Sequence, residues 1–108
     1  MKKIGFFPKK IFWTNHSQAK MRYWQLSQSR VERVINNPTR FEKGLAPKTI
    51  AVMQRVTAKR PYEIWVMFQD SPSKRKIISA WRYPGITKAG EPLPPEIIKE
   101  IKQSIKYV

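Results

Sequence analysis

The chain has 108 residues, which is enough for one domain with a single hydrophobic core but not for two. It holds 22 Lys and Arg residues against 7 Asp and Glu residues, and the net charge of +15 indicates a polyanionic partner, with RNA first and a small acidic protein second. Because there is no cysteine and one histidine, disulfides, Cys-based zinc sites and multi-His metal sites are excluded, and we expect no metal and no cofactor.

The positive charge is concentrated in the first part of the chain. Residues 1–60 carry 14 cations and 2 anions, a net charge of +12. Pro8, Lys9 and Lys10 interrupt the apolar residues near the N-terminus, and no apolar run approaches the ~20 residues that span a bilayer. We therefore predict a cytoplasmic protein with no membrane partner. We predict a single domain with a core at residues 9–84. Residues 85–108 are predicted to form a C-terminal extension that contains a helix.

A short strand and a helix are predicted first. Residues 9–15, KKIFWTN, have the length and composition of a short strand. Residues 16–27, HSQAKMRYWQLS, then place apolar and aromatic side chains at helical spacing, which predicts an amphipathic helix of about three turns. Either Asn15 or Ser17 can cap this helix.

A second helix is predicted directly after the first. In residues 27–38, SQSRVERVINNP, the valines and the isoleucine form an apolar stripe, and the Asn-Asn-Pro sequence ends the pattern. Ser27 or Ser29 can cap this helix. Residues 39–48, which contain Gly44, are predicted to form a loop.

Three strands are predicted next, because three segments rich in β-branched and aromatic residues are separated by Pro, Gly, Asp and Ser. They are Thr49–Val56, residues 62–69 and Lys74–Pro84. Short connections between them favour an antiparallel meander. In the last strand, alternation predicts two faces, one with Ile77, Ser79, Trp81 and Tyr83 and the other with Ile78, Ala80 and Arg82.

The end of the chain predicts one more helix. Residues 96–108, EIIKEIKQSIKYV, space four isoleucines along one helical face, and we expect that face to cover the sheet or a partner. The fold class predicted from the whole chain is α+β, in which two N-terminal helices and a C-terminal helix pack on an antiparallel β-sheet.

Three sequence features occur in a familiar order: a histidine that opens the first helix in HSQAKMR, the Asn-Pro turn in VINNP, and the strand end IISAWRY. This pattern resembles uncharacterised small bacterial domains grouped with RelE- and ParE-like toxins, within the barnase and colicin ribonuclease superfamily. The resemblance covers roughly residues 11–84 and implies a RelE-like fold. The recurrent positions of the family map to His16, Arg22 and Arg82, while a second basic residue expected shortly after Arg22 is absent.

The resemblance implies a toxin-like ribonuclease that cuts RNA without a metal, by attack of the 2′-hydroxyl on the adjacent phosphate. In this hypothesis His16 and Tyr83 move protons, and Arg22 and Arg82 hold the phosphate and stabilise its developing charge. His16, Arg22 and Arg82 would converge where the start of the first helix faces the end of the last strand, with Tyr83 or Lys20 nearby. The alternative for His16 is an ordinary hydrogen bond at a helix start, and the alternative for the arginines is a solvated surface position.

The predicted nucleic-acid-binding residues combine cations with one aromatic side chain that can stack on an unpaired base. They are Lys20, Arg30, Arg40, Arg55, Lys74, Arg75, Lys76 and Trp81. Burial in the core is the competing interpretation for the aromatic residues of the sheet, and it is the preferred one for Trp65.

The sequence leaves open whether the protein is an enzyme. One histidine and no paired carboxylates favour the alternative function, a non-catalytic nucleic-acid-binding domain or an interaction domain of the toxin–antitoxin type. A small acidic protein is the possible partner in that second case.

Overall fold

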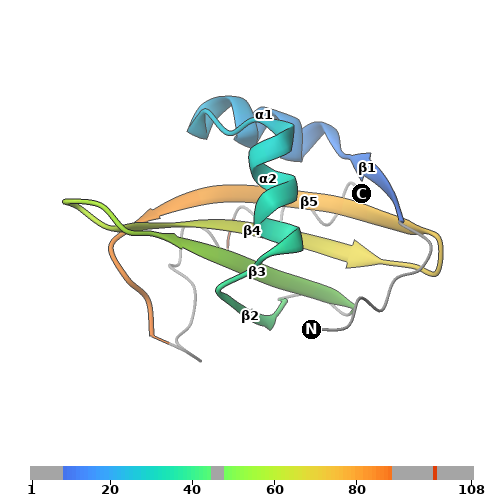
Figure 1. Cartoon of the computed structure of the whole chain (residues 1–108). Helices are drawn as coiled ribbons and strands as arrows, with labels where there is room; N and C mark the ends of the chain where they lie inside the picture. The colour runs from blue at the N-terminus through green and yellow to red at the C-terminus, as the bar shows by residue number, and fades with distance from the viewer. Residues whose placement is uncertain (1–8, 45–47, 89–98, 100–108) are drawn as a thin grey trace.

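The computed structural model describes residues 9–44, 48–88 and 99, and within them the chain forms five strands and two helices. In chain order these are β1 (Lys10–Trp13), α1 (Asn15–Trp24), α2 (Gln28–Asn36), β2 (Arg40–Lys43), β3 (Thr49–Val56), β4 (Tyr62–Asp70) and β5 (Lys74–Pro84). The strands form one sheet in the order β1-β5-β4-β3-β2. Figure 1 shows both helices on the same side of this sheet.

The sheet is mixed, so the prediction of an antiparallel sheet is wrong. Strands β2 to β5 pair antiparallel in sequence order, but β1 pairs parallel with β5, from Lys10 opposite Lys74 to Trp13 opposite Ile77. The reason is the long path between these two strands. The chain leaves β1, crosses the sheet through both helices, and enters the sheet again at its far edge as β2, so β1 and β5 are neighbours in space only.

The predicted C-terminal helix falls at residues that lie outside the described ranges, apart from Lys99. The described fold therefore holds two helices rather than three. A second difference is that β2 occupies residues predicted as a loop. Neither helix in the described part of the chain has the length and apolar character needed to cross a bilayer.

Side-chain caps define where both helices begin. The Thr14 hydroxyl accepts a hydrogen bond from Ser17 N and donates one to Ile77 O at 2.7 Å, so it caps α1 and also ties the start of α1 to β5. This residue precedes both predicted caps. In α2 the cap is Ser27, which is one of the two predicted alternatives. Its hydroxyl accepts a hydrogen bond from Arg30 N at 3.0 Å.

Both faces of the sheet are buried. The helix face packs against the two helices through Met21, Leu26, Val31, Val34, Ile35, Val52, Ile64, Val66, Phe68, Ile77 and Ala80. The opposite face buries a second cluster formed by Ala51, Met53, Trp65, Met67, Ile78 and Trp81. The predicted core position of Trp65 is confirmed, because 1% of this residue is exposed.

A β-bulge changes which side chains of β5 share a face. Met67 pairs with Ser79 and Phe68 pairs with Ile77, which leaves Ile78 as an extra residue in β5. The extra residue reverses the alternation at this point. Ile77 therefore packs on the helix face and not on the face of Ser79, where simple alternation placed it.

Candidate nucleic-acid interface

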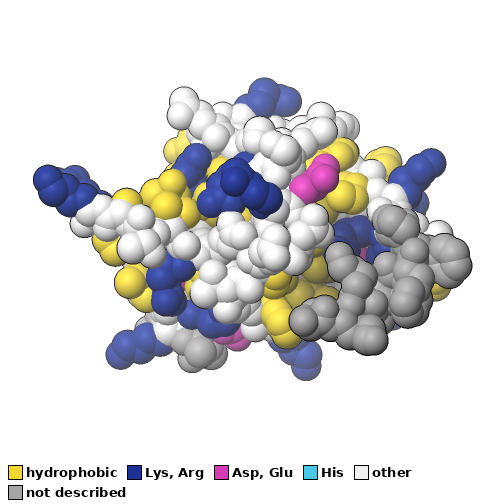
Figure 2. Space-filling model, in the orientation of Figure 1, with side chains coloured by type: hydrophobic (Ala, Val, Ile, Leu, Met, Phe, Trp, Pro, Cys, Tyr) yellow, Lys and Arg dark blue, Asp and Glu magenta, His cyan; other side chains and the backbone are white. Residues whose placement is uncertain are grey.

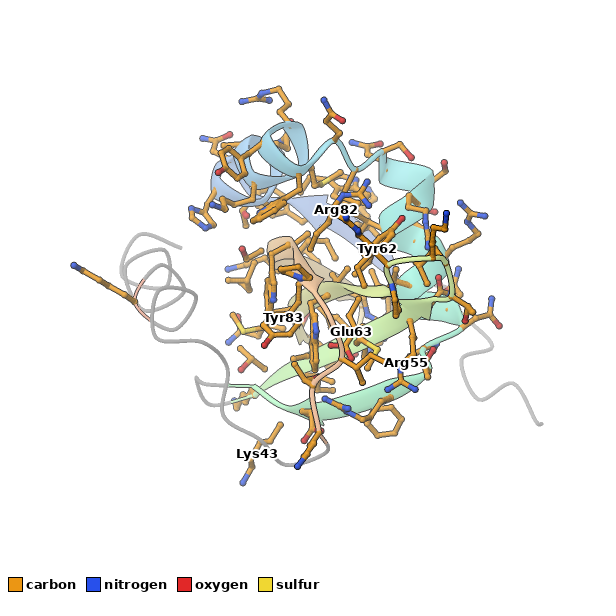
Figure 3. The ribbon with its side chains drawn as sticks, turned by 90° about the vertical axis from the view of Figure 1, so that its left-hand side faces the viewer. Lys43, Arg55, Tyr62, Glu63, Arg82 and Tyr83 are labelled. Atoms are coloured by element: carbon orange, nitrogen blue, oxygen red, sulfur yellow. The ribbon has the colours of Figure 1, made fainter. Side chains whose placement is uncertain are left out.

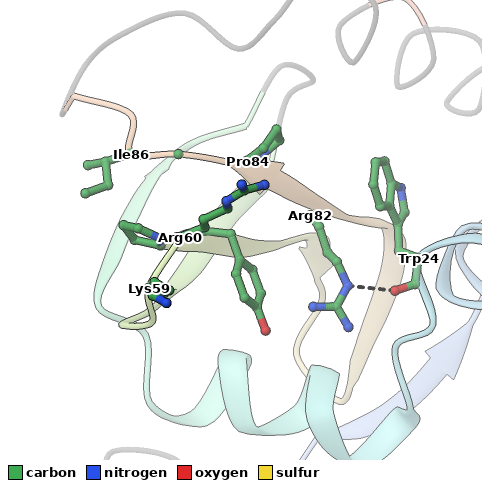
Figure 4. A pocket seen from close by; sticks show the side chains of 9 residues that line it. Trp24, Lys59, Arg60, Arg82, Pro84 and Ile86 are labelled. Atoms are coloured by element: carbon green, nitrogen blue, oxygen red, sulfur yellow. Dashed lines mark hydrogen bonds between the residues drawn. The ribbon is translucent and has the colours of Figure 1, made fainter.

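A cavity of about 870 Å³ opens at one end of the sheet, where the hairpin between β3 and β4, the end of β5 and the C-terminal end of α1 meet. Figure 4 shows this cavity, which we call the cationic pocket. Nine described residues line it: Trp24, Lys59, Arg60, Pro61, Tyr62, Arg82, Pro84, Gly85 and Ile86.

The hairpin and the end of β5 are held together beside the pocket. Gly85 N donates a hydrogen bond to Pro61 O at 3.1 Å, which ties the turn that follows β5 to the start of β4. Gly85 has a φ of 106°, a backbone conformation that side chains disfavour, so glycine suits this turn. Lys59 and Arg60 are exposed in the hairpin turn, and both line the pocket.

Arg82 lies in the pocket wall and is held in place by three contacts. Its Nε donates to Trp24 O at 2.7 Å and its Nη2 donates to Gln25 O at 3.3 Å. Its guanidinium carbon lies 5.3 Å from the centre of the Tyr62 ring. Carbonyls at the end of α1 carry a partial negative charge, so a cation is favoured there. The guanidinium is therefore oriented before any ligand arrives.

A second arginine adds to the same positive region. Arg30 Nη1 donates to Gln54 Oε1 at 2.6 Å. Burial lowers the pKa of Arg30, and the positive charges of Arg33 and Arg82 lower it further, while Tyr62 acts in the opposite direction. The positive charges of Arg30 and Arg82 therefore disfavour each other.

No acidic residue is found among the described residues that line the pocket, and three of them are cationic. On the face drawn in Figure 2, Lys and Arg side chains project from the end where the β3–β4 hairpin lies and gather over α2, with one small acidic patch nearby. The described lining of the pocket therefore combines positive charge with the aromatic rings of Trp24 and Tyr62.

The predicted catalytic residues do not converge. His16 lies in the first turn of α1, next to the Thr14 cap that joins β5 at Ile77, whereas Arg82 bonds the carbonyls at the other end of α1. Trp24 follows His16 by eight positions, a rise of roughly 12 Å along the helix. Arg22 is exposed on α1.

Tyr83 lies on the other side of the sheet from Arg82. Tyr83 packs against the cluster opposite the helices, while Arg82 contacts Tyr62 on the helix side. Figure 3 shows the same division, with Arg82 and Tyr62 near the helices and Tyr83 near Glu63. Consecutive strand residues point to opposite faces, so this separation follows from the strand itself.

Several predicted binding residues already have protein partners. Arg75 makes two hydrogen bonds to the Asp70 carboxylate, at 2.7 and 2.8 Å. Lys74 lies over the Phe12 ring and Lys20 over the Tyr23 ring. Lys76 is half-buried in β5. Among the predicted binding residues, Arg30 is one whose charge interacts with Arg82 of the cationic pocket.

Trp81 cannot stack on a base in this structure, because 1% of it is exposed. Its ring stacks on Trp65 instead, with centroids 5.9 Å apart and planes inclined by 2°. The aromatic residue proposed from sequence for base stacking is therefore part of the core opposite the helices.

Arg40 and Arg55 belong to a polar network around a buried carboxylate. Glu63 is fully buried, and its Oε1 accepts hydrogen bonds from Trp65 Nε1 at 2.9 Å and from Thr87 Oγ1 at 2.8 Å. Its Oε2 accepts from Thr87 N at 2.9 Å and lies 3.8 Å from Arg55 Nη2. Arg40 completes the network.

Both terminal nitrogens of Arg40 bond to Thr87, Nη1 to the carbonyl at 2.9 Å and Nη2 to the hydroxyl at 2.7 Å. Arg40 also pairs with Glu42 at 2.9 Å and lies over the Trp65 ring. Thr87 is thereby fixed on the sheet directly after Ile86, a residue of the pocket wall. Arg40 is thus committed to partners within the fold, whereas Arg55 is exposed and contributes an ion pair to Glu63.

The main pocket residues, Lys59, Arg60, Tyr62 and Trp24, were not predicted from the sequence as binding residues. The available signal was the short sequence KRPY, which places two cations in a turn between two strands and an aromatic residue at the next strand start. The periodicity of apolar residues carries no information in a turn. The sequence therefore identified KRPY only as the boundary between two strands.

Comparisons with protein-family models, with curated proteins and with solved structures give no match. In the part of the chain that the structure describes, no group of three or more His, Cys, Asp or Glu side chains is placed to hold a metal ion.

Proposed function

We propose that this protein binds single-stranded RNA through the cationic pocket. The observation that carries the proposal is the presence of Arg82, Lys59 and Arg60 beside Trp24 and Tyr62 in one pocket, without an acidic residue among the described lining residues. Phosphate groups would neutralise these cations and release counterions from the RNA, and this release supplies most of the affinity of such contacts. The net charge of +15 would speed the encounter.

The proposal is for binding without cleavage. A ribonuclease of the kind suggested by the RelE resemblance needs proton-transfer groups beside the bound phosphate. His16 is at the far end of α1 from Arg82, and Tyr83 is on the other face of the sheet. The non-catalytic alternative therefore has the better support from the geometry.

The test is the salt dependence of RNA binding, measured by fluorescence anisotropy with a labelled single-stranded oligonucleotide. Three phosphate contacts, at Lys59, Arg60 and Arg82, would give a slope of about −2.1 for log K against log salt, from about −0.7 per contact on a single strand. The double variant Lys59→Ala/Arg60→Ala should make the slope shallower by about 1.4, because two of these contacts are removed.

The matched control is Lys10→Ala/Lys43→Ala, which removes the same charge from exposed positions at the other end of the sheet. This variant should keep the wild-type slope. An absence of RNA binding at low salt would refute the proposed function and would favour an acidic protein partner. An equal change of slope in both double variants would show that the charge acts diffusely, without a defined site.

A further inference from the structure

The cationic pocket differs from a simple basic patch because most of the residues that line it are apolar or aromatic. Trp24 and Tyr62 contribute rings, and Pro61, Pro84 and Ile86 contribute apolar surface. A phosphate group alone would gain nothing from this surface, and an apolar ligand would gain nothing from three cations. A nucleotide has both a flat base and adjacent anionic groups, so its chemistry matches both parts of the pocket.

We infer that the pocket receives one unstacked nucleotide of a single-stranded RNA, with its base against Trp24 and Tyr62 and its flanking phosphates at Lys59, Arg60 and Arg82. This inference rests on the proposed function and names the unit that the site recognises. The cavity, at about 870 Å³, falls within the range of pockets that hold small organic ligands, so a base and its ribose fit.

The geometry of Arg82 supports this occupant. Its guanidinium is fixed by the carbonyls of Trp24 and Gln25 and lies over the Tyr62 ring, so a flat cation and a flat ring already stand together in the wall. In Figure 4, Arg60 and Ile86 lie on the side of the pocket away from Trp24, with Arg82 between them. A base entering this space would have planar groups on the wall of Trp24 and Arg82 and cations along the rim.

The lining also indicates how selective the site is. The described lining residues include no carboxylate or amide side chain, the groups that pair with adenine and cytosine edges. Stacking accepts every base because each has a π-face. Recognition at this site is therefore specific for an unpaired base and does not select adenine or cytosine through side chains, while Lys59, Arg60 and Arg82 can bind the acceptor edge of guanine.

The experiment compares two oligonucleotides with the same number of phosphates, pentauridylate and a chain of five abasic ribose phosphates. The wild-type protein should bind pentauridylate more tightly by roughly 5- to 150-fold, the range expected for one stacked base. In Trp24→Leu this preference should fall to near onefold, while Trp24→Phe should keep most of it. The control Trp13→Leu changes a half-buried tryptophan of β1 that also packs on the helix-face core, and it should keep the preference.

A thermal melt of each variant shows whether it folds. If Trp24→Leu does not fold, Tyr62→Leu tests the same wall of the pocket. Equal binding of the two oligonucleotides by the wild-type protein would overturn the inference and leave the proposed function standing. Binding of neither would refute both. A preference that persists in Trp24→Leu and in Tyr62→Leu would place the base elsewhere and also overturn the inference.

Discussion

Thr87→Val tests whether the buried network around Glu63 holds the segment behind the pocket wall. Valine has nearly the shape of threonine, so the substitution removes the hydroxyl and little else. That hydroxyl donates to Glu63 at 2.8 Å and accepts from Arg40 at 2.7 Å. Hydrogen bonds with a charged partner contribute ~1.5–3 kcal/mol each, so we expect the free energy of unfolding to fall by about 3 kcal/mol.

Urea denaturation followed by tryptophan fluorescence measures this change. With a slope near ~2 kcal/mol/M, the midpoint should move down by about 1.5 M urea at an unchanged slope. Thr87→Ser restores the hydroxyl and should recover most of the loss. Thr57→Val makes the same substitution at an exposed residue and should change the stability by less than ~0.5 kcal/mol. Equal midpoints for Thr87→Val and Thr57→Val would refute the structural role of the network.

Three further predictions concern stability. Burial alone would raise the pKa of Asp70, but hydrogen bonds and charges from its basic neighbours outweigh this and lower it. Because the folded pKa lies below the unfolded value, ionised Asp70 stabilises the fold above pH ~4 and the effect is lost as the pH falls through the folded pKa. In urea denaturation, Asp70→Asn should therefore be less stable than wild type at pH 7 and approach it below pH ~4; a constant difference would contradict this. Ser27→Ala removes the cap of α2 and should cost ~1 kcal/mol in thermal denaturation, whereas Ser29→Ala should cost much less, and equal effects would argue against the cap. Arg82→Lys keeps the charge but loses the planar fork that bonds the end of α1, and it should cost ~1–2 kcal/mol in the same assay; an unchanged melting curve would show that the fork is dispensable.

The strands of the second half were predictable because their apolar, β-branched composition and their flanking prolines act locally. Thr49–Val56 and Lys74–Pro84 have the predicted bounds. Strand β2 was missed because its four residues, RFEK, carry three charges and one aromatic ring, which resembles an exposed loop. The bulge at Ile78 was missed because it depends on the partner strand, which a single segment does not reveal.

The predicted catalytic residues lie apart because the first strand runs in the direction opposite to the one predicted for an antiparallel sheet. Because β1 runs parallel to β5, α1 begins beside Ile77 and runs along β5 until its last carbonyls meet Arg82. An antiparallel β1 would instead have brought His16 to the end of β5, as the sequence analysis supposed. The relative direction of two strands about sixty residues apart depends on long-range packing, so local patterns could not supply it.

Nuclear magnetic resonance can locate bound RNA on the protein, by titration of isotope-labelled protein with a short single-stranded oligonucleotide. We expect the largest amide shift changes at residues 59, 60, 62, 82, 83, 85 and 86, together with the Trp24 indole signal. Shift changes concentrated at the start of α1 around His16, or at residues 74–76, with little change at the cationic pocket, would contradict this expectation.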